Sequence, residues 1–203
     1  MTESESLPDG ATSRLPLAVL VSGAPGAGKS TLADALGAGL DLPVVHKDLL
    51  VHGVWRSRGQ ALELGVAGVE PFYETMELWS ALGISFVAEQ TFYRGVSEPD
   101  VARRLEPRCV LVNVHCRSSY ARERFERRMR DDPLCGEARL RKLLPLVEAL
   151  QSELSEPLAF DCPIIVVDTD EGYSPPLTSM IERIDAIYSR PLVHDLDRPA
   201  PTV

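Results

Sequence analysis

The sequence has few cysteines and no long run of apolar residues. None of its four cysteines, Cys109, Cys116, Cys135 and Cys162, is in a C-x-x-C pair, the spacing typical of metal and redox motifs. No apolar run reaches the roughly 18 residues that a helix needs to cross a bilayer. The first fifteen residues lack the basic and apolar regions of a secretion signal. These absences argue against a disulfide-stapled or membrane-spanning protein and predict a reduced, cytoplasmic one.

Basic residues are also scarce. The chain has 21 Lys and Arg against 30 Asp and Glu, a net charge of −9. Such a surface repels polyanions on average, so we expect neither nucleic acid nor an anionic membrane as a general partner. A length of 203 residues suits one α/β domain better than two large ones.

The expected domain covers residues 15–189. Residues 1–14 and 190–203 have little for a core to bury, which predicts a flexible leader and a tail. Between them, strand-like runs at 17–22, 42–46, 84–88, 109–115 and 163–167 alternate with helical patterns at 29–40, 71–82, 118–130, 140–154 and from about 174. This alternation predicts a parallel sheet with crossover helices. Residues 53–70, with weak periodicity, are interpreted as a substrate-side flap or a long connection.

One stretch carries a specific motif. It fits G-x-x-x-x-G-K-[ST] at every fixed position and reads Gly23-Ala24-Pro25-Gly26-Ala27-Gly28-Lys29-Ser30, followed by Thr31. It lies between a strand and a helix, where backbone N–H groups and the helix N-terminus converge on phosphates. We predict a polyphosphate cradle in which Lys29 contacts the β and γ phosphates of ATP and Ser30 binds Mg²⁺. An ordinary glycine-rich turn is the alternative.

Two carboxylates are expected at the edge of the sheet where ligands bind. Asp48 follows the second strand and is a candidate base for a substrate hydroxyl, or alternatively a helix cap. Glu89 ends an apolar strand, where it could hold Mg²⁺, directly or through its water shell, or bind substrate. A merely solvated strand end is the remaining alternative for Glu89.

Arginines are concentrated between residues 117 and 130. Arg124 and Arg128 share one side of the expected helix, and we predict that this pair contacts phosphate from a lid at about 117–140. A solvated face paired with nearby acids is the alternative. Arg94 is a candidate on the substrate side. His46 and His115 lie in or beside strands, and we expect them to be packed and hydrogen-bonded rather than catalytic.

At five places the chain resembles the small P-loop kinases often labelled AAA-family ATPases, and it is similar to zeta toxins, chloramphenicol phosphotransferase and the kinase domain of polynucleotide kinases. The matching residues are 23–31, Lys47-Asp48, 85–92, 121–128 and 166–169. The resemblance implies an α/β nucleoside-monophosphate-kinase-like fold, with a five-stranded parallel sheet in the order 2-3-1-4-5 and flanking helices. It also implies ATP and Mg²⁺ as cosubstrates.

The resemblance further implies roles for individual residues. Asp48 would be the base, Arg124 and Arg128 the lid arginines, and Thr169 with Asp170 would lie at the start of the adenine-side loop. Many members carry Asp at the position of Glu89, so the geometry at that strand end is expected to differ.

Together these features predict an ATP-dependent kinase that phosphorylates a hydroxyl of a small molecule such as an antibiotic, a sugar or a nucleotide-like compound. One alternative is an ATP-binding regulatory or switch protein. Another is a zeta-toxin-like or nucleic-acid-end kinase. The sequence leaves the acceptor and the oligomeric state open.

Overall fold

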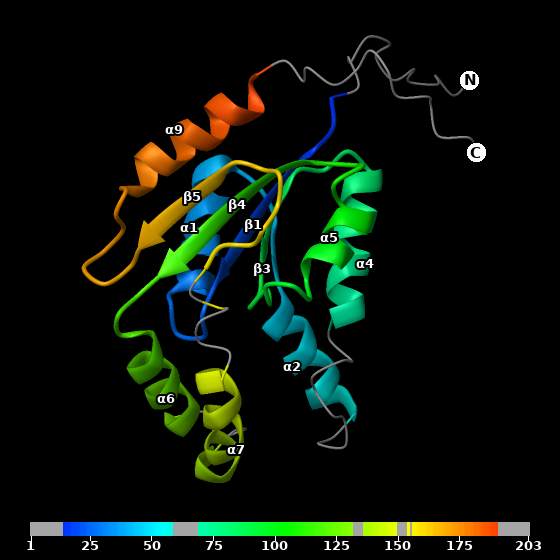
Figure 1. The fold of residues 1–203 in the computed structure, drawn as a ribbon. Helices are drawn as coiled ribbons and strands as arrows, with labels where there is room; N and C mark the ends of the chain where they lie inside the picture. Colours follow the sequence, from blue (N-terminus) through cyan, green and yellow to red (C-terminus); the bar gives the residue numbers. More distant parts are fainter. Residues whose placement is uncertain (1–13, 59–68, 132–135, 150–153, 155, 191–203) are drawn as a thin grey trace, which may run out of the picture.

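A parallel sheet forms the centre of the molecule. The computed structural model describes residues 14–58, 69–131, 136–149, 154 and 156–190. Within them a five-stranded sheet has the order β2-β3-β1-β4-β5 (Figure 1). Its strands are β1 (Leu17–Gly23), β2 (Val44–His46), β3 (Phe86–Glu89), β4 (Val110–Arg117) and β5 (Ile164–Asp168). The order implied by the resemblance is therefore confirmed.

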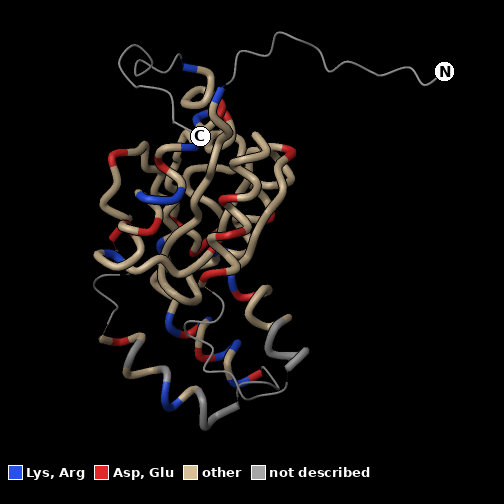
Figure 2. Tube along the Cα trace, turned by 90° about the vertical axis from the view of Figure 1, so that its right-hand side faces the viewer, with Lys and Arg blue, Asp and Glu red and all other residues tan. Residues whose placement is uncertain are grey.

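Helices cover both faces of the sheet and extend beyond one edge. One face packs against α1 (Lys29–Leu40) and α9 (Leu177–Tyr188), and the other against α4 (Val69–Ala81) and α5 (Glu98–Arg104). Beyond the carboxyl ends of the strands lie α2 (Lys47–Arg58), α6 (Ala121–Asp131) and α7 (Gly136–Ala149) (Figure 1). Residues of both charges lie along this lower group of helices (Figure 2). No helix in the described ranges has the length and apolar character needed to cross a membrane.

The sheet separates two apolar clusters. Because successive side chains of a strand point to opposite faces, Val19 and Val21 pack with α1 and α9, whereas Ala18 and Leu20 pack with α4 and α5. All four side chains are fully buried, as expected for a strand covered on both sides. This packing fixes the carboxyl end of β1, from which the phosphate loop begins.

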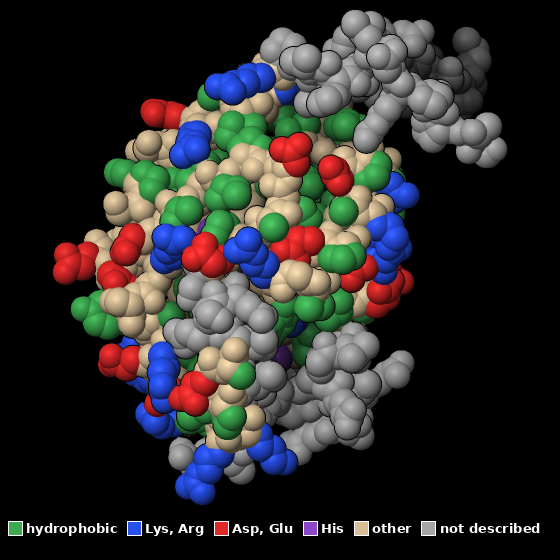
Figure 3. Space-filling view, in the orientation of Figure 1, with side chains coloured by type: hydrophobic (Ala, Val, Ile, Leu, Met, Phe, Trp, Pro, Cys, Tyr) green, Lys and Arg blue, Asp and Glu red, His purple; other side chains and the backbone are tan. Residues whose placement is uncertain are grey.

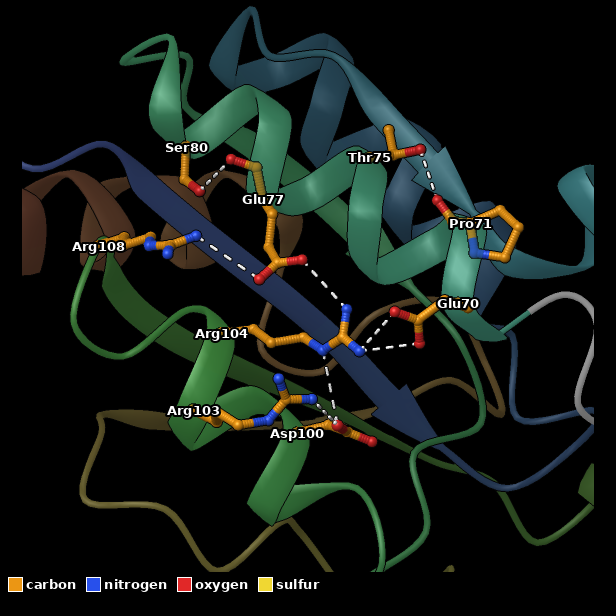
Figure 4. A network of polar contacts seen from close by, with 9 residues as sticks. All are labelled: Glu70, Pro71, Thr75, Glu77, Ser80, Asp100, Arg103, Arg104 and Arg108. Carbon is orange, nitrogen blue, oxygen red and sulfur yellow. Dashed lines mark hydrogen bonds and ion pairs between the residues drawn. The ribbon is translucent and has the colours of Figure 1, made fainter.

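A charged network joins α4 to α5 on the second face (Figure 4). The guanidinium of Arg104 donates to both carboxylate oxygens of Glu70 at 2.7 and 2.8 Å and to Glu77 at 3.1 Å. It also lies 3.6 Å from Asp100 and over the ring of Tyr73. Because Arg104 is buried, these partners replace the water that its charge has lost. The network therefore sets the position of α5 against α4.

Two expectations about the elements need correction. Residues 53–70, expected to form a flap or a long connection, are helical where the structure describes them: residues 53–58 continue α2, and Val69 and Glu70 begin α4. The weak apolar pattern has a physical reason: α2 projects beyond the sheet (Figure 1), so a helix there needs no broad apolar stripe. The short helix α5 carried too few residues for a periodic signal and was not expected. The expected leader and tail, Cys135 and the remaining flap residues 59–68 lie outside the described residues, apart from Arg14 and Arg190.

Candidate active site

The phosphate loop connects β1 to the first turn of α1. Gly28 is the N-cap residue of α1, with a φ of 82°, and it offers no side-chain cap. The first turn of α1 also has no acidic side chain. The first N–H groups of a helix have no partners within the helix, and here neither a side-chain cap nor an acidic residue of the first turn pairs with them. This helix end can therefore accept an anion such as phosphate.

Lys29 is the centre around which the other charged groups gather. Its buried ammonium donates to the carbonyl oxygen of Ala24 at 3.0 Å. Burial lowers the pKa of Lys29, whereas the charges of Glu89 and Asp48 act to raise it and that of Arg128 acts to lower it further. Three residues from separate parts of the chain thus act electrostatically on one ammonium group. A bound polyphosphate would favour the charged form of Lys29 and compensate for its burial.

Glu89 stands beside the serine that is predicted to bind Mg²⁺. Its carboxylate is buried, accepts a hydrogen bond from the hydroxyl of Ser30 at 3.2 Å, and lies 4.0 Å from the ammonium of Lys29. A hydroxyl and a carboxylate are the oxygen donors that suit Mg²⁺, directly or through water. The described residues contain no group of three or more His, Cys, Asp or Glu arranged to hold a metal. A cation here would therefore need phosphate oxygens and water to complete its coordination, which fits a metal that arrives with a nucleotide.

His46 touches the same carboxylate. Its Nδ1 lies 3.0 Å from Glu89 and its Nε2 lies 2.9 Å from Asp34 on α1. The hydrogen bond to Glu89 is the main cause that raises the pKa of His46 to about 8. The expectation that His46 is hydrogen-bonded is confirmed. The sequence analysis did not predict the contact between His46 and Glu89. The two residues are partners in register at the ends of adjacent parallel strands, so the pairing of these two strands would have predicted it.

Asp48, the predicted base, acts electrostatically on Tyr93. Asp48 is in the first turn of α2, its side chain is 69% exposed, and it lies 3.8 Å from the ammonium of Lys47. A carboxylate in this turn also suits the helix dipole, so the capping interpretation and the catalytic one remain compatible. Burial, and then the charge of Asp48, raises the pKa of Tyr93, which places that phenol near the carboxylate. Arg94 is exposed in the turn after β3, and its predicted substrate contact stays a prediction.

The two predicted lid arginines have different surroundings. Arg124 donates to the carbonyl oxygens of Thr169 and Asp170, at 3.2 Å each, and Thr169 donates to the carbonyl of Ala27 in the phosphate loop at 3.0 Å. Arg128, by contrast, is exposed and acts on Lys29. Several Lys and Arg side chains face solvent over α6 and α7 (lower part of Figure 3). Phosphate contact by both arginines stays a prediction.

Asp170 joins the loop after β5 to the turn before α6. Its carboxylate accepts hydrogen bonds from the hydroxyl of Ser118 at 2.6 Å and from the backbone N–H of Ser119 at 3.1 Å. The hydrogen bonds from the hydroxyls of Ser118 and Ser119, and then the bond from the backbone N–H of Ser119, lower the pKa of Asp170. In this arrangement the carboxylate holds the loop in place, and the predicted nucleotide contact of Asp170 stays a prediction.

A buried polar chain lies directly under the loop. Asn113 donates to the hydroxyl of Ser22 at 3.1 Å and to the carbonyl of Leu20 at 3.1 Å. The same hydroxyl lies 3.0 Å from Nδ1 of His115. His115 is thus packed and hydrogen-bonded, as expected. Ser22 immediately precedes the phosphate loop, so this network steadies the strand end from which the loop departs.

Comparison with solved structures identifies the fold. A proposed kinase from Chloroflexus aurantiacus is 22% identical over 85% of this chain and 96% of its own, with a TM-score of 0.69. Kti12 of Chaetomium thermophilum, solved with ADP-AlF3, is 15% identical over 85% and 100%, with a TM-score of 0.64. The APS kinase CysC of Mycobacterium tuberculosis, solved with AMPPNP and APS, is 15% identical over 87% and 99%, with a TM-score of 0.53. No protein-family model and no curated protein sequence matches the chain. The chain therefore has the fold of the small P-loop kinases.

Proposed function

We propose that this protein is an ATP-dependent phosphotransferase that moves the γ-phosphate of ATP to a hydroxyl of a small molecule. The observation that carries the proposal is the buried carboxylate of Glu89, which lies 4.0 Å from the ammonium of Lys29 at a helix N-terminus without a side-chain cap. The charges of Asp48 and Arg128 also act on Lys29. A phosphate cradle alone suits any nucleotide-binding protein. A phosphoryl-transfer enzyme also needs an acceptor for the substrate proton, a site for a divalent cation and further positive charge on the transferred group.

Each requirement has a candidate in this group. The uncapped end of α1 and the ammonium of Lys29 would hold the β and γ phosphates. Ser30 and Glu89 would hold Mg²⁺, which when bound neutralises charge on the phosphate oxygens. Asp48 would orient the acceptor hydroxyl and take its proton, since its carboxylate is exposed and lies within electrostatic reach of Lys29. Arg128 would add positive charge from the side of α6.

The acceptor is sought with a coupled assay for ADP release. Purified protein is given ATP and Mg²⁺ with a panel of antibiotics, sugars, nucleotides and UDP-aminosugars. We expect one class of compound to stimulate ADP release and to appear as a phosphorylated product by mass spectrometry. Asp48→Asn should then lower kcat by about 100-fold or more while ATP still binds, because general-base catalysis typically contributes a factor of 10² to 10⁴.

A matched variant separates this effect from a change in net charge. Asp185→Asn removes one exposed carboxylate from α9, outside the group around Lys29, and should leave kcat unchanged. Wild-type protein that fails to bind ATP would overturn the proposal altogether. Full activity of Asp48→Asn on an identified acceptor would overturn the role of Asp48. ATP-dependent capture of a protein partner that is insensitive to Asp48→Asn, without any phosphorylated product, would instead favour a switch protein.

A further inference from the structure

The carboxylate of Glu89 is held by more than the two phosphate-loop residues beside it. One of its oxygens is shared by the hydroxyl of Ser30 at 3.2 Å and Nδ1 of His46 at 3.0 Å. The other oxygen faces the ammonium of Lys29 at 4.0 Å. The side chain of Glu89 is only 6% exposed, so these three groups replace most of its hydration.

His46 also connects Glu89 to the outer surface of α1. Its second ring nitrogen contacts Asp34 at 2.9 Å, and Asp34 lies one helical turn after Ser30, so both point to the same side of α1. The imidazole ring therefore bridges an exposed carboxylate, that of Asp34, and a buried one, that of Glu89.

The bridge determines which way Glu89 presents its oxygens. A glutamate side chain has three rotatable torsions. Ser30 is exposed, and its single hydrogen bond would not fix all three torsions of Glu89. A serine hydroxyl that donates to Glu89 keeps its lone pairs free to accept a cation. His46 contacts the carboxylate from the neighbouring strand, β2, and so helps to keep it oriented toward the hydroxyl of Ser30.

We propose that His46 is a positioning residue for the divalent cation: it orients Glu89 toward Ser30 through Nδ1, and Asp34 steadies the ring through Nε2. This inference rests on the proposed function, because it assumes that Ser30 and Glu89 serve a metal that arrives with a nucleotide. His46 itself touches neither nucleotide nor acceptor. Its effect is therefore expected first in metal affinity and only secondarily in turnover.

Binding of Mn²⁺ in the presence of saturating ADP tests the inference without any acceptor. Free Mn²⁺ is followed by electron paramagnetic resonance in titrations of the wild type and of three His46 variants. His46→Ala should weaken Mn²⁺ binding about 10-fold, the lower end of the usual effect of losing a partner that orients a metal ligand. His46→Asn places an amide nitrogen near the position of Nδ1 and should recover most of the affinity. His46→Gln places it near Nε2, toward Asp34, and should not.

Two further variants keep the test decisive if His46→Ala folds poorly. Asp34→Ala leaves the contact between His46 and Glu89 in place and should weaken Mn²⁺ binding less than His46→Ala does. Arg103→Ala breaks an exposed ion pair on α5, away from the phosphate loop, and should have no effect on Mn²⁺. Circular dichroism and thermal unfolding of each variant show whether the fold is retained.

The outcomes separate the inference from the function on which it rests. Equal Mn²⁺ affinity in the wild type and a folded His46→Ala protein would overturn the inference while leaving the kinase proposal intact. Equal losses for His46→Asn and His46→Gln would also overturn it, because contact through Nδ1 would then not be what matters. Wild-type protein that binds neither ADP nor Mn²⁺ with ADP would contradict the proposed function itself.

Discussion

Replacing Gly26 by alanine should force α6 away from the phosphate loop. The φ of Gly26 is +85°, and a Cβ there would lie 1.9 Å from the carbonyl oxygen of Ala121 and 2.9 Å from the backbone nitrogen of Phe125. Both obstacles are backbone atoms at the start of α6, so no rotation of a side chain can relieve the overlap. The left-handed conformation costs an alanine roughly 1–2 kcal/mol, and forced displacement of packed backbone adds about 1–3 kcal/mol. We expect the free energy of unfolding to fall by about 2–5 kcal/mol.

Gly95 provides a matched control. Its φ is +79°, close to that of Gly26, but a Cβ would meet nothing within 4 Å. Gly95→Ala should therefore cost only the roughly 1–2 kcal/mol of the backbone conformation, and the loss of chain entropy in the unfolded state is common to both variants. Urea unfolding followed by circular dichroism gives the two free energies. Equal losses would refute the contact between α6 and the loop. With the proposed function, only Gly26→Ala should also weaken ADP binding, measured by calorimetry.

Three further predictions test other contacts. Arg104→Ala should lower the free energy of unfolding by about 2–4 kcal/mol, because it leaves the carboxylates of α4 and α5 without their shared cation, whereas Arg103→Ala at an exposed pair should cost less than about 1 kcal/mol. Thr169→Val should cost about 1–2 kcal/mol in urea unfolding, because it leaves the carbonyl of Ala27 without its donor. The pKa of Asp170 is lowered in the folded state, so this carboxylate stabilises the protein above its ordinary pKa of 3.8 and loses that effect as the pH falls through the lowered value. The difference in Tm between wild type and Asp170→Asn should therefore be largest at neutral pH and shrink toward pH 3.

The results that would contradict these three predictions are equally specific. Equal free energies for the two arginine variants would mean that burial adds nothing to the network around Arg104. An unchanged free energy for Thr169→Val would mean that water satisfies the carbonyl of Ala27. A Tm difference for Asp170→Asn that stays constant between pH 7 and pH 3 would mean that the serine hydrogen bonds do not depend on the charge of the carboxylate.

Local pattern was enough to predict most of the sheet. Strands buried on both faces need continuous apolar residues, and this requirement is visible in β1 and β4 without any knowledge of their neighbours. The helix α2 escaped prediction because it extends beyond the sheet and has little apolar surface to bury. A helix that packs against few other elements does not need a periodic pattern of apolar residues.

The arginine-rich helix shows where spacing stops being informative. Arg124 and Arg128 are four residues apart, so the sequence places them on one side of α6 and predicts a common role. In the folded protein Arg124 donates to the carbonyls of Thr169 and Asp170, while Arg128 acts on Lys29. The two arginines differ because the loop after β5 lies beside Arg124. The residue pattern within α6 does not predict the position of that loop.

By itself the sequence determined the phosphate loop, because its glycines, Lys29 and Ser30 act through a strand, a turn and a helix that are contiguous in the chain. It also determined that Asp48 and Glu89 follow strands, and parallel strands bring their carboxyl ends to one edge. Only the tertiary structure decided which groups surround each of these carboxylates. His46 and Glu89 are 43 residues apart and meet because β2 and β3 pair in register, and Asp34 joins them because α1 packs across those strand ends. Contacts between distant segments depend on how elements pack, and it is through such contacts that a buried carboxylate acquires its orientation.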